Sequence, residues 1–401
     1  MKRIFSNLLF KIFVAIVLGI FFGLYLPEWF NRIFTTFNAL FGEFLVFSIP
    51  LIIMGLIMPA IADLGKGAGK LLLITTVIAY GSTLFSGFAT YLSTSHLFSS
   101  ILAPYVNETT ELAEVGRDLV PYFSITIPPA IDVMYALFFS FVIGLGLSLK
   151  ETSALKSMVK DFGDIIKWLI ERVIVPLLPL FILGIFTGIS FSGQVVSILS
   201  VFLNIIGVIF ALHILLILLY YTIAGIYTKQ NPLKLLATML PAYFTGLGTQ
   251  SSAATIPVTL EQTIKNGVSE KIAGFVIPLC ATIHLSGSIM KITACAIALM
   301  ILKGMPISLS LFSGFIFMLG IAMIAAPGVP GGAIMAAIGL LQSMLGFNEE
   351  MIGLMIALYI AMDNFGTACN VTGDGAIALV VDKITKEKIP ATVIESANKM
   401  Q

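Results

Sequence analysis

The chain has 401 residues, of which 58% are hydrophobic and only 11% are charged. Soluble domains carry about 25% charged residues, so this composition excludes a water-soluble globule and indicates an integral membrane protein with several spans. The formal net charge of +1 argues against nucleic acid as a partner. The three cysteines form no CxxC pair, so we expect buried thiols rather than a metal or redox site.

The N-terminal segment combines a basic start with an apolar stretch, as secretory signal peptides do. Lys11 interrupts that stretch, and no small-x-small cleavage site precedes Pro27. We therefore expect a retained first transmembrane helix.

Apolar runs long enough to cross a bilayer recur along the chain. A hydrocarbon core of roughly 30 Å requires about 20 helical residues. The predicted spans are 8–29, 36–62, 71–95, 133–149, 168–193, 195–227, 272–300 and 351–381. An acidic, polar loop is expected over 96–132 on the outer side.

Two further regions, 233–264 and 308–346, each consist of two short apolar arms joined by a Gly/Ser/Pro break. Arms of about 10–12 residues reach about 15–18 Å as helices, which is too short to cross. We predict two re-entrant helical hairpins. Together with eight transmembrane helices they make an all-α membrane protein.

The basic residues agree with this topology. If the hairpins do not cross, all but four of the 22 Lys and Arg residues lie on the side of the N-terminus; Arg32, Arg117 and Lys303 lie outside, and Lys291 lies within a span. The positive-inside rule therefore favours re-entrant hairpins. It predicts cytoplasmic N- and C-termini in a multi-pass protein of the cell (inner or plasma) membrane.

Each predicted hairpin precedes a helix that contains a polar stretch, at 281–288 and at 364–375. Irregular backbone survives in a membrane only where protein or a watery cavity surrounds it. Paired interrupted segments of this kind indicate the binding site of an inverted-repeat secondary transporter. Ser251 and Ser252, at the turn of the first hairpin, can donate hydrogen bonds to a carboxylate.

Asp363 and Asp374 lie in the last predicted span, where an ionisable residue is expected to be functional. Eleven residues correspond to about 16 Å along an unbroken helix, so the two aspartates should serve separate sites. An ion pair with Lys291 is the alternative for Asp363, and a position near the inner helix end is the alternative for Asp374. His284 is either a ligand contact or a polar residue that satisfies the helix break.

Three motifs in fixed order resemble the dicarboxylate/amino acid:cation symporter family, which includes the glutamate transporters. They are TQSSAATIP (249–257), GVPGG (328–332) and NVTGD (370–374). The resemblance is strong over about 235–383 and weak over the first six helices.

This resemblance implies a glutamate-transporter-like inverted-repeat fold, a homotrimer and an elevator-type mechanism. Residues 1–232 would be predominantly scaffold and trimerisation helices, some of which contribute to the transport unit. Residues 233–383 would form the transport core, and 384–401 a cytoplasmic tail.

The resemblance also implies residue roles. Asp363 would bind the substrate's amino group and Asn370 its carboxylate. One sodium ion would bind beside Asn370 and Asp374, and carbonyls of the second hairpin tip would help hold another. The implied substrate-binding residues are Ser251, Ser252, Ser288, Val329, Asp363, Gly366, Thr367 and Asn370. The implied sodium ligands are Asn370 and Asp374, with carbonyls near Thr282 and His284.

Departures from the family pattern narrow the range of substrates that we expect. Members with acidic substrates usually carry an arginine at the position of Gly366, and no arginine occurs in 233–383. A dianionic substrate would therefore lack its bidentate partner. Because Asp363 is retained, we expect a small neutral amino acid such as serine, alanine or threonine. Symport of a dicarboxylate or acidic amino acid, coupled to H⁺ or Na⁺, is the alternative.

The family's asparagine and aspartate in the seventh helix are replaced here by His284 and Ser286. Loss of that carboxylate predicts fewer coupled sodium ions, or a proton in place of one.

An enzyme is not expected. Ser286 and His284 are two residues apart and point in different directions on a helix, and Asp363 and Asp374 are too far apart to share a proton. An ion channel is a more remote alternative, because polar breaks also line pores.

Overall fold

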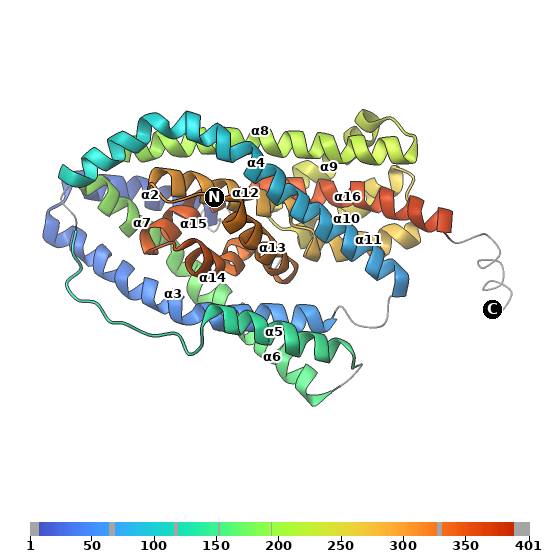
Figure 1. The fold of residues 1–401 in the computed structure, drawn as a ribbon, viewed down its shortest axis with the longest axis horizontal. Helices are drawn as coiled ribbons and strands as arrows, with labels where there is room; N and C mark the ends of the chain where they lie inside the picture. The colour runs from blue at the N-terminus through green and yellow to red at the C-terminus, as the bar shows by residue number, and fades with distance from the viewer. Residues whose placement is uncertain are drawn as a thin grey trace.

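The computed structural model describes residues 8–63, 69–115, 119–150, 153–193, 195–326 and 331–388. Within these ranges every regular element is helical, which confirms the predicted all-α class (Figure 1). In chain order the elements are α2 (Leu8–Tyr25), α3 (Glu28–Asp63), α4 (Gly69–Val115), α5 (Val133–Ser148), α6 (Ala154–Leu169), the π-helical turn η2 (Ile170–Ile174), α7 (Val175–Phe191), α8 (Val195–Thr228), α9 (Pro232–Thr249), α10 (Ser252–Lys265), α11 (Glu270–Ile283), α12 (Ser286–Leu302), α13 (Leu309–Ala325), α14 (Gly332–Leu345), α15 (Glu349–Ala361) and α16 (Asp363–Lys388).

Six helical stretches of the described chain are long and apolar enough to cross a membrane, and a seventh is added if α15 and α16 form one bent span. The six are Leu8–Tyr25, Glu28–Ala62, Leu71–Tyr105, Ala154–Phe191, Ile198–Thr228 and Glu270–Leu302. They correspond to predicted spans, and the predicted span 133–149 is the shorter helix α5, with 16 residues. A multi-pass membrane protein is therefore confirmed.

The loop between the third and fourth predicted spans begins later than the predicted start at residue 96. Helix α4 continues to Val115, about twenty residues beyond the predicted span. The segment 96–115 contains no glycine, and eight of its 20 residues are leucine, alanine or glutamate, which favour helix continuation even where hydropathy falls. The helix continues through Pro104.

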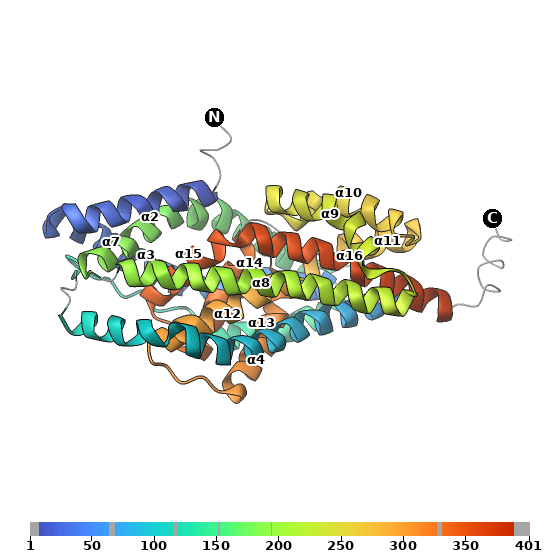
Figure 2. The same ribbon diagram turned by 90° about the horizontal axis from the view of Figure 1, so that it is seen from above.

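The helices form two groups that pack internally. The peripheral group consists of α2, α3, α5, α6, η2 and α7, in which α2 lies along α7 and α3 lies against α5, α6 and α7. The central group consists of α4 and α8–α16, in which α4 packs on α12 and α8 packs on α16. Figure 1 shows the helices α12–α15 between the long helices α4 and α8 on one side and α3 on the other, and Figure 2 shows α8 running alongside α16.

Burial separates the outer faces from the core. Phe13 of α2 is 62% exposed and Leu203 of α8 is 73% exposed, as apolar side chains that face lipid would be. By contrast, α12 is buried along its whole length from Ser286 to Met300. The polar residues of α12 therefore lie in the protein interior, where each needs a partner.

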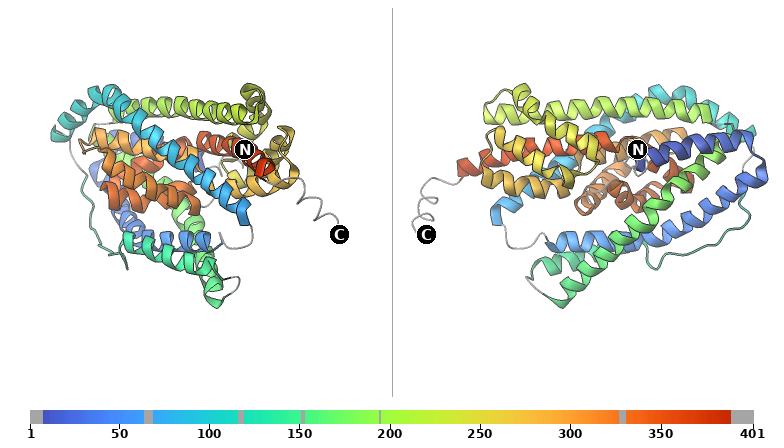
Figure 3. Two further views of the ribbon diagram at one scale, coloured as in Figure 1. Left: turned by 45° about the vertical axis from the view of Figure 1, so that its right-hand side comes forward. Right: turned by 180° about the vertical axis from the view of Figure 1, so that it is seen from behind.

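The first predicted hairpin is present as a helix–turn–helix. Helix α9 ends at Thr249, Gln250 adopts a left-handed conformation with φ 54°, and the Ser251 hydroxyl caps α10 by accepting from the Ala254 amide. Both arms pack against α16, and α10 also packs against α11 (Figure 3). The predicted break between the arms is confirmed.

The second hairpin consists of α13 and α14, which pack against each other and against α3. Gly331, with φ 75°, precedes α14. Most of the tip, 327–330, lies outside the described residues, and the predicted contact Val329 lies there too.

The break in the seventh predicted span is confirmed at His284 and Leu285, between α11 and α12. The break predicted within 364–375 is wrong, because this segment is continuous helix in α16. The chain bends instead by 59° at Met362, between α15 and α16. The glycines of this segment serve close packing: a Cβ on Gly373 would lie 2.9 Å from His284 Cε1.

A glycine pair on α9 tests the packing of the first hairpin on α16. A Cβ on Gly246 would lie 3.0 Å from the Ala368 Cα, whereas one on Gly248 would meet no atom within 4 Å. Gly246→Leu should therefore destabilise the protein by about 1–3 kcal/mol, and Gly248→Leu should not. The melting temperatures of the two detergent-solubilised variants measure this difference; equal values would contradict the packing.

Candidate functional site

Asp363, the first residue of α16, is buried and has a partner on each carboxylate oxygen. Its Oδ1 accepts from Lys291 Nζ of α12 at 2.9 Å, and its Oδ2 accepts from the Gly331 amide at 2.9 Å. The side chain of Lys291 is 0% exposed and that of Asp363 is 6% exposed. The ion pair considered as an alternative from the sequence is thus present, and it joins α16, α12 and the second hairpin.

The Lys291 ammonium lies in space left by a glycine. A Cβ on Gly366 would lie 2.5 Å from both Cε and Nζ of Lys291. On its other side, Nζ lies 3.7 Å from the ring centroid of Tyr359, a cation–π distance. The absence of arginine from 233–383 therefore does not leave this site without a cation, because a lysine from the facing helix occupies the space beside Gly366.

Ser288 and Asn370 lie next to this pair in one hydrogen-bond network. Asn370 Oδ1 accepts from the Gly287 amide at 2.8 Å, and its Nδ2 donates to Ser288 Oγ at 3.3 Å. The Tyr359 hydroxyl also donates to Ser288 Oγ, at 3.2 Å. The network connects the start of α12 with the middle of α16.

The predicted ligands on α16 share one face. Thr367, Asn370 and Asp374 follow Asp363 by 4, 7 and 11 residues in one continuous helix, a spacing that keeps them on the same side. Thr367 is 6% exposed and Asn370 is 2% exposed. The structure thus brings Asp363, Gly366, Thr367 and Asn370 together.

The first hairpin tip reaches the first turn of α16 through a different residue. Gln250 Nε2 donates to Asn364 Oδ1 at 2.6 Å. Ser252 is buried and Ser251 caps α10. Both predicted serines therefore lie at the tip that meets α16, and the contact itself is made by Gln250.

Asp374 is the centre of a second polar cluster. Its Oδ1 lies 2.8 Å from His284 Nδ1, and His284 Nε2 lies 3.1 Å from Ser82 Oγ. Ser82 in turn donates to the Tyr220 hydroxyl at 2.8 Å. Ser82 on α4 and Tyr220 on α8 were missed from the sequence, because isolated polar residues on long apolar helices carry no motif.

One side chain of this cluster suits a hard monovalent cation, and two others do not. Among the described residues, Asp374 Oδ2 is buried without a hydrogen-bond partner, and a carboxylate oxygen is the ligand such a cation prefers. The His284 ring supplies no oxygen, and both its nitrogens are engaged. The Thr282 side chain is exposed and donates to the Leu279 carbonyl, so only main-chain oxygens of these two residues can contribute.

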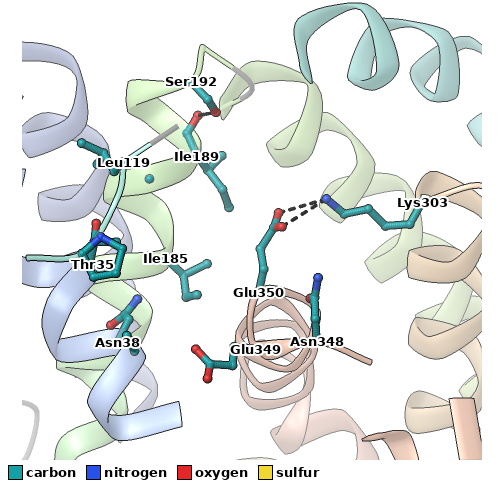
Figure 4. A pocket seen from close by; sticks show the side chains of 14 residues that line it. Thr35, Asn38, Leu119, Ile185, Ile189, Ser192, Lys303, Asn348, Glu349 and Glu350 are labelled. Carbon is teal, nitrogen blue, oxygen red and sulfur yellow. Dashed lines mark hydrogen bonds and ion pairs between the residues drawn. The ribbon is translucent and has the colours of Figure 1, made fainter. Parts of the chain in front are cut away.

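A separate cavity of about 680 Å³ lies between α3, α7 and α15 (Figure 4). Lys303 lies 3.1 Å from Glu350 on its α15 side, and Asn38 faces it from α3. The part of α15 that lines the cavity is its first turn. Asp363 follows the other end of this 13-residue helix, about 18 Å from the first turn along the helix axis. The cavity is a cleft between the peripheral and central groups, away from the Asp363 site.

Comparison with known proteins decides the family. The model of the sodium:dicarboxylate symporter family matches residues 8–384. The chain belongs to this family. The family assignment confirms the resemblance inferred from the three motifs, and this family is one of transporters and not of enzymes.

Two kinds of curated relative show how far the similarity extends. The chain is 25% identical over 395 residues to the serine/threonine transporter SstT of Acinetobacter baumannii, covering 94% of this chain and 96% of that one. It is 26% identical over 322 residues to the excitatory amino acid transporter 1 of Rattus norvegicus, covering 75% of this chain. The match spans about half, 56%, of the length of that transporter.

The His284–Asp374 pair can be tested by a double-mutant cycle. His284→Ala should lower stability by about 1–3 kcal/mol, because it removes the partner of a buried carboxylate. His284→Ala combined with Asp374→Ala should lose less than the sum of the single changes. Melting temperatures in sodium-free buffer provide the measurement, and strictly additive losses would show that the two side chains do not interact.

Proposed function

We propose that this protein is a sodium-coupled symporter of a small neutral amino acid that works by an elevator-type alternating-access mechanism. The observation that carries the proposal is the buried Asp363–Lys291 pair at the meeting point of α12, α16 and the second hairpin. Its two opposite charges match the ammonium and carboxylate groups of an amino acid zwitterion.

The charge balance favours a neutral substrate. Lys291 and Asp363 sum to zero, so a zwitterion leaves this buried site neutral, whereas glutamate or aspartate adds a negative charge. Among the described residues of the central group, no arginine is present to compensate it. An uncompensated charge inside a membrane protein is costly.

The relatives agree with an amino acid as cargo. One is named a serine/threonine transporter and the other an excitatory amino acid transporter. The relative that matches nearly end to end is the serine/threonine transporter, which supports a small hydroxyl-bearing or aliphatic substrate here.

Symport of a dicarboxylate or acidic amino acid is the second candidate, and Lys291 is the observation that favours it. Its ammonium lies beside Gly366, where acidic-substrate members carry an arginine, and could take a carboxylate. Against this candidate, Asp363 would repel the second carboxylate at short range.

Sodium is proposed as the coupling ion, with the unpartnered Asp374 oxygen and the Asn370 side chain as its ligands from α16. A proton is the alternative, because a histidine lies where the family places an asparagine. A bound sodium ion would neutralise the Asp374 carboxylate, whose Oδ2 has no hydrogen-bond partner among the described residues.

The architecture proposed for transport follows the two helix groups. We place both termini in the cytoplasm of a cell-membrane homotrimer, with α9–α10 and α13–α14 as re-entrant hairpins of an inverted repeat and eight spans in total. Residues 233–383 are the moving core and most of 1–232 the scaffold. The packing of α4 on α12 and of α8 on α16 favours including these two earlier helices in the moving unit.

Uptake by proteoliposomes tests the proposed substrate class. With an inward sodium gradient, labelled serine, alanine or threonine should accumulate, and unlabelled glutamate or aspartate should compete at least tenfold more weakly. The reason is the extra negative charge, which corresponds to at least about 1.4 kcal/mol at that ratio. Stronger competition by glutamate than by serine would favour the second candidate instead.

The sodium dependence of uptake tests the ion sites. Because Ser286 supplies no carboxylate, the Hill coefficient for sodium should lie between about one and two, below that of relatives with the aspartate. Initial uptake rates at varied sodium and constant ionic strength give this value. Uptake that is indifferent to sodium but driven by an inward proton gradient would assign the coupling to protons.

A further inference from the structure

Asp363 already has a cation of its own. In the described structure its Oδ1 is bound by the Lys291 ammonium at 2.9 Å and its Oδ2 by the Gly331 amide at 2.9 Å. A substrate ammonium bound to Asp363 would compete with the Lys291 ammonium for the same carboxylate. Lys291 therefore occupies the place that the proposed substrate's amino group needs.

The chain is built to admit this lysine. Gly366 leaves the volume that Nζ and Cε fill, and Tyr359 offers its ring face to the ammonium. The lysine side chain is a flexible chain of four carbons, so its ammonium can leave Asp363 without a movement of α12. The Ser288–Asn370 network lies within one turn of Lys291 on the same helix face, and Asn370 is the residue to which the family resemblance assigns the substrate's carboxylate.

We infer that Lys291 is a tethered counter-cation: it neutralises Asp363 while the site is empty and transfers to the substrate's carboxylate when the substrate's ammonium takes its place on Asp363. The inference rests on the proposed function and adds a step to it. The empty site and the zwitterion-loaded site then carry the same net charge, zero, from these residues.

A direct consequence concerns the return of the empty carrier. A bare carboxylate at this depth would have to bind a cation from solution before it crossed the membrane, because buried charge without a partner is strongly unfavourable. With Lys291 in place, return requires no such cation. The substrate-free half of the cycle is therefore independent of small cations inside the vesicle.

Two transport modes in proteoliposomes separate this role from a structural one. Net uptake requires return of the empty carrier, whereas exchange against unlabelled internal substrate does not. In Lys291→Gln, net uptake should fall about a hundredfold, as expected for loss of the partner of a buried charge, while exchange at saturating substrate falls less than tenfold. Equal losses in both modes would overturn the inference, as would unchanged net uptake.

Controls keep this result interpretable. Lys167→Gln removes an exposed lysine paired with Asp164 on α6 and should leave both modes unchanged. In Lys291→Ala, methylammonium inside the vesicles should restore net uptake at least tenfold, because a free amine can fill the vacated space on Asp363. Failure of this rescue in a variant that still exchanges substrate would contradict the counter-cation role.

The wild-type protein provides a test that does not depend on folding of a variant. Net uptake into vesicles that contain only choline as internal cation should equal, within twofold, uptake into vesicles that contain potassium. A tenfold lower net uptake with internal choline, in protein that still exchanges substrate, would overturn the inference about Lys291 but not the proposed function. Absence of exchange for every amino acid would instead contradict the proposed function.

Discussion

The ion pair between Asp363 and Lys291 is the contact on which the centre of the molecule depends. It ties the first residue of α16 to α12, and through the Gly331 amide it also holds the start of α14. A buried charge without its partner is strongly destabilising. A ligand that enters here must therefore exchange partners with these groups rather than fill an empty space, and the second hairpin must respond, because its main chain binds the same carboxylate.

One face of α16 organises both polar clusters. Asp363 and Asp374 lie about 16 Å apart along the helix, and Asn370 lies between them. Asn370 binds the Gly287 amide, which lies just after the break at His284 and Leu285. The Asp363 site proposed for the substrate and the Asp374 cluster proposed for sodium thus share the first turn of α12. A shift of that turn would change both at once, which is a physical basis for coupling between them.

Much of the fold follows from the sequence because helix breaks inside apolar segments need special residues. The turn at Gln250 and Ser251 and the break at His284 and Leu285 were predicted from polar runs, and both are present. The break at Met362 was not, because neither glycine nor proline marks it. Hydropathy alone cannot show where tertiary packing bends a helix.

The glycines of 364–375 were misread for the same reason. A glycine inside a helix can mark a break or a close approach, and the sequence does not distinguish the two. Gly366, Gly373 and Gly375 lie in continuous helix, where a Cβ would clash with Lys291, His284 and Met239 respectively. Each admits a side chain from another element, and those partners are set by the tertiary fold.

Gly366 shows why the charge of a site cannot be inferred from the residue at one position. Replacing an arginine by glycine removes a charge from α16, but it also vacates a volume, and Lys291 fills that volume from the facing helix. The charge of a site therefore depends on every element that lines it, and not on one position in the chain. A cation carried on α12 faces Asp363 directly, so the two charges compensate each other when no ligand is present. A second substrate carboxylate would therefore have to compete with Asp363 for the Lys291 ammonium.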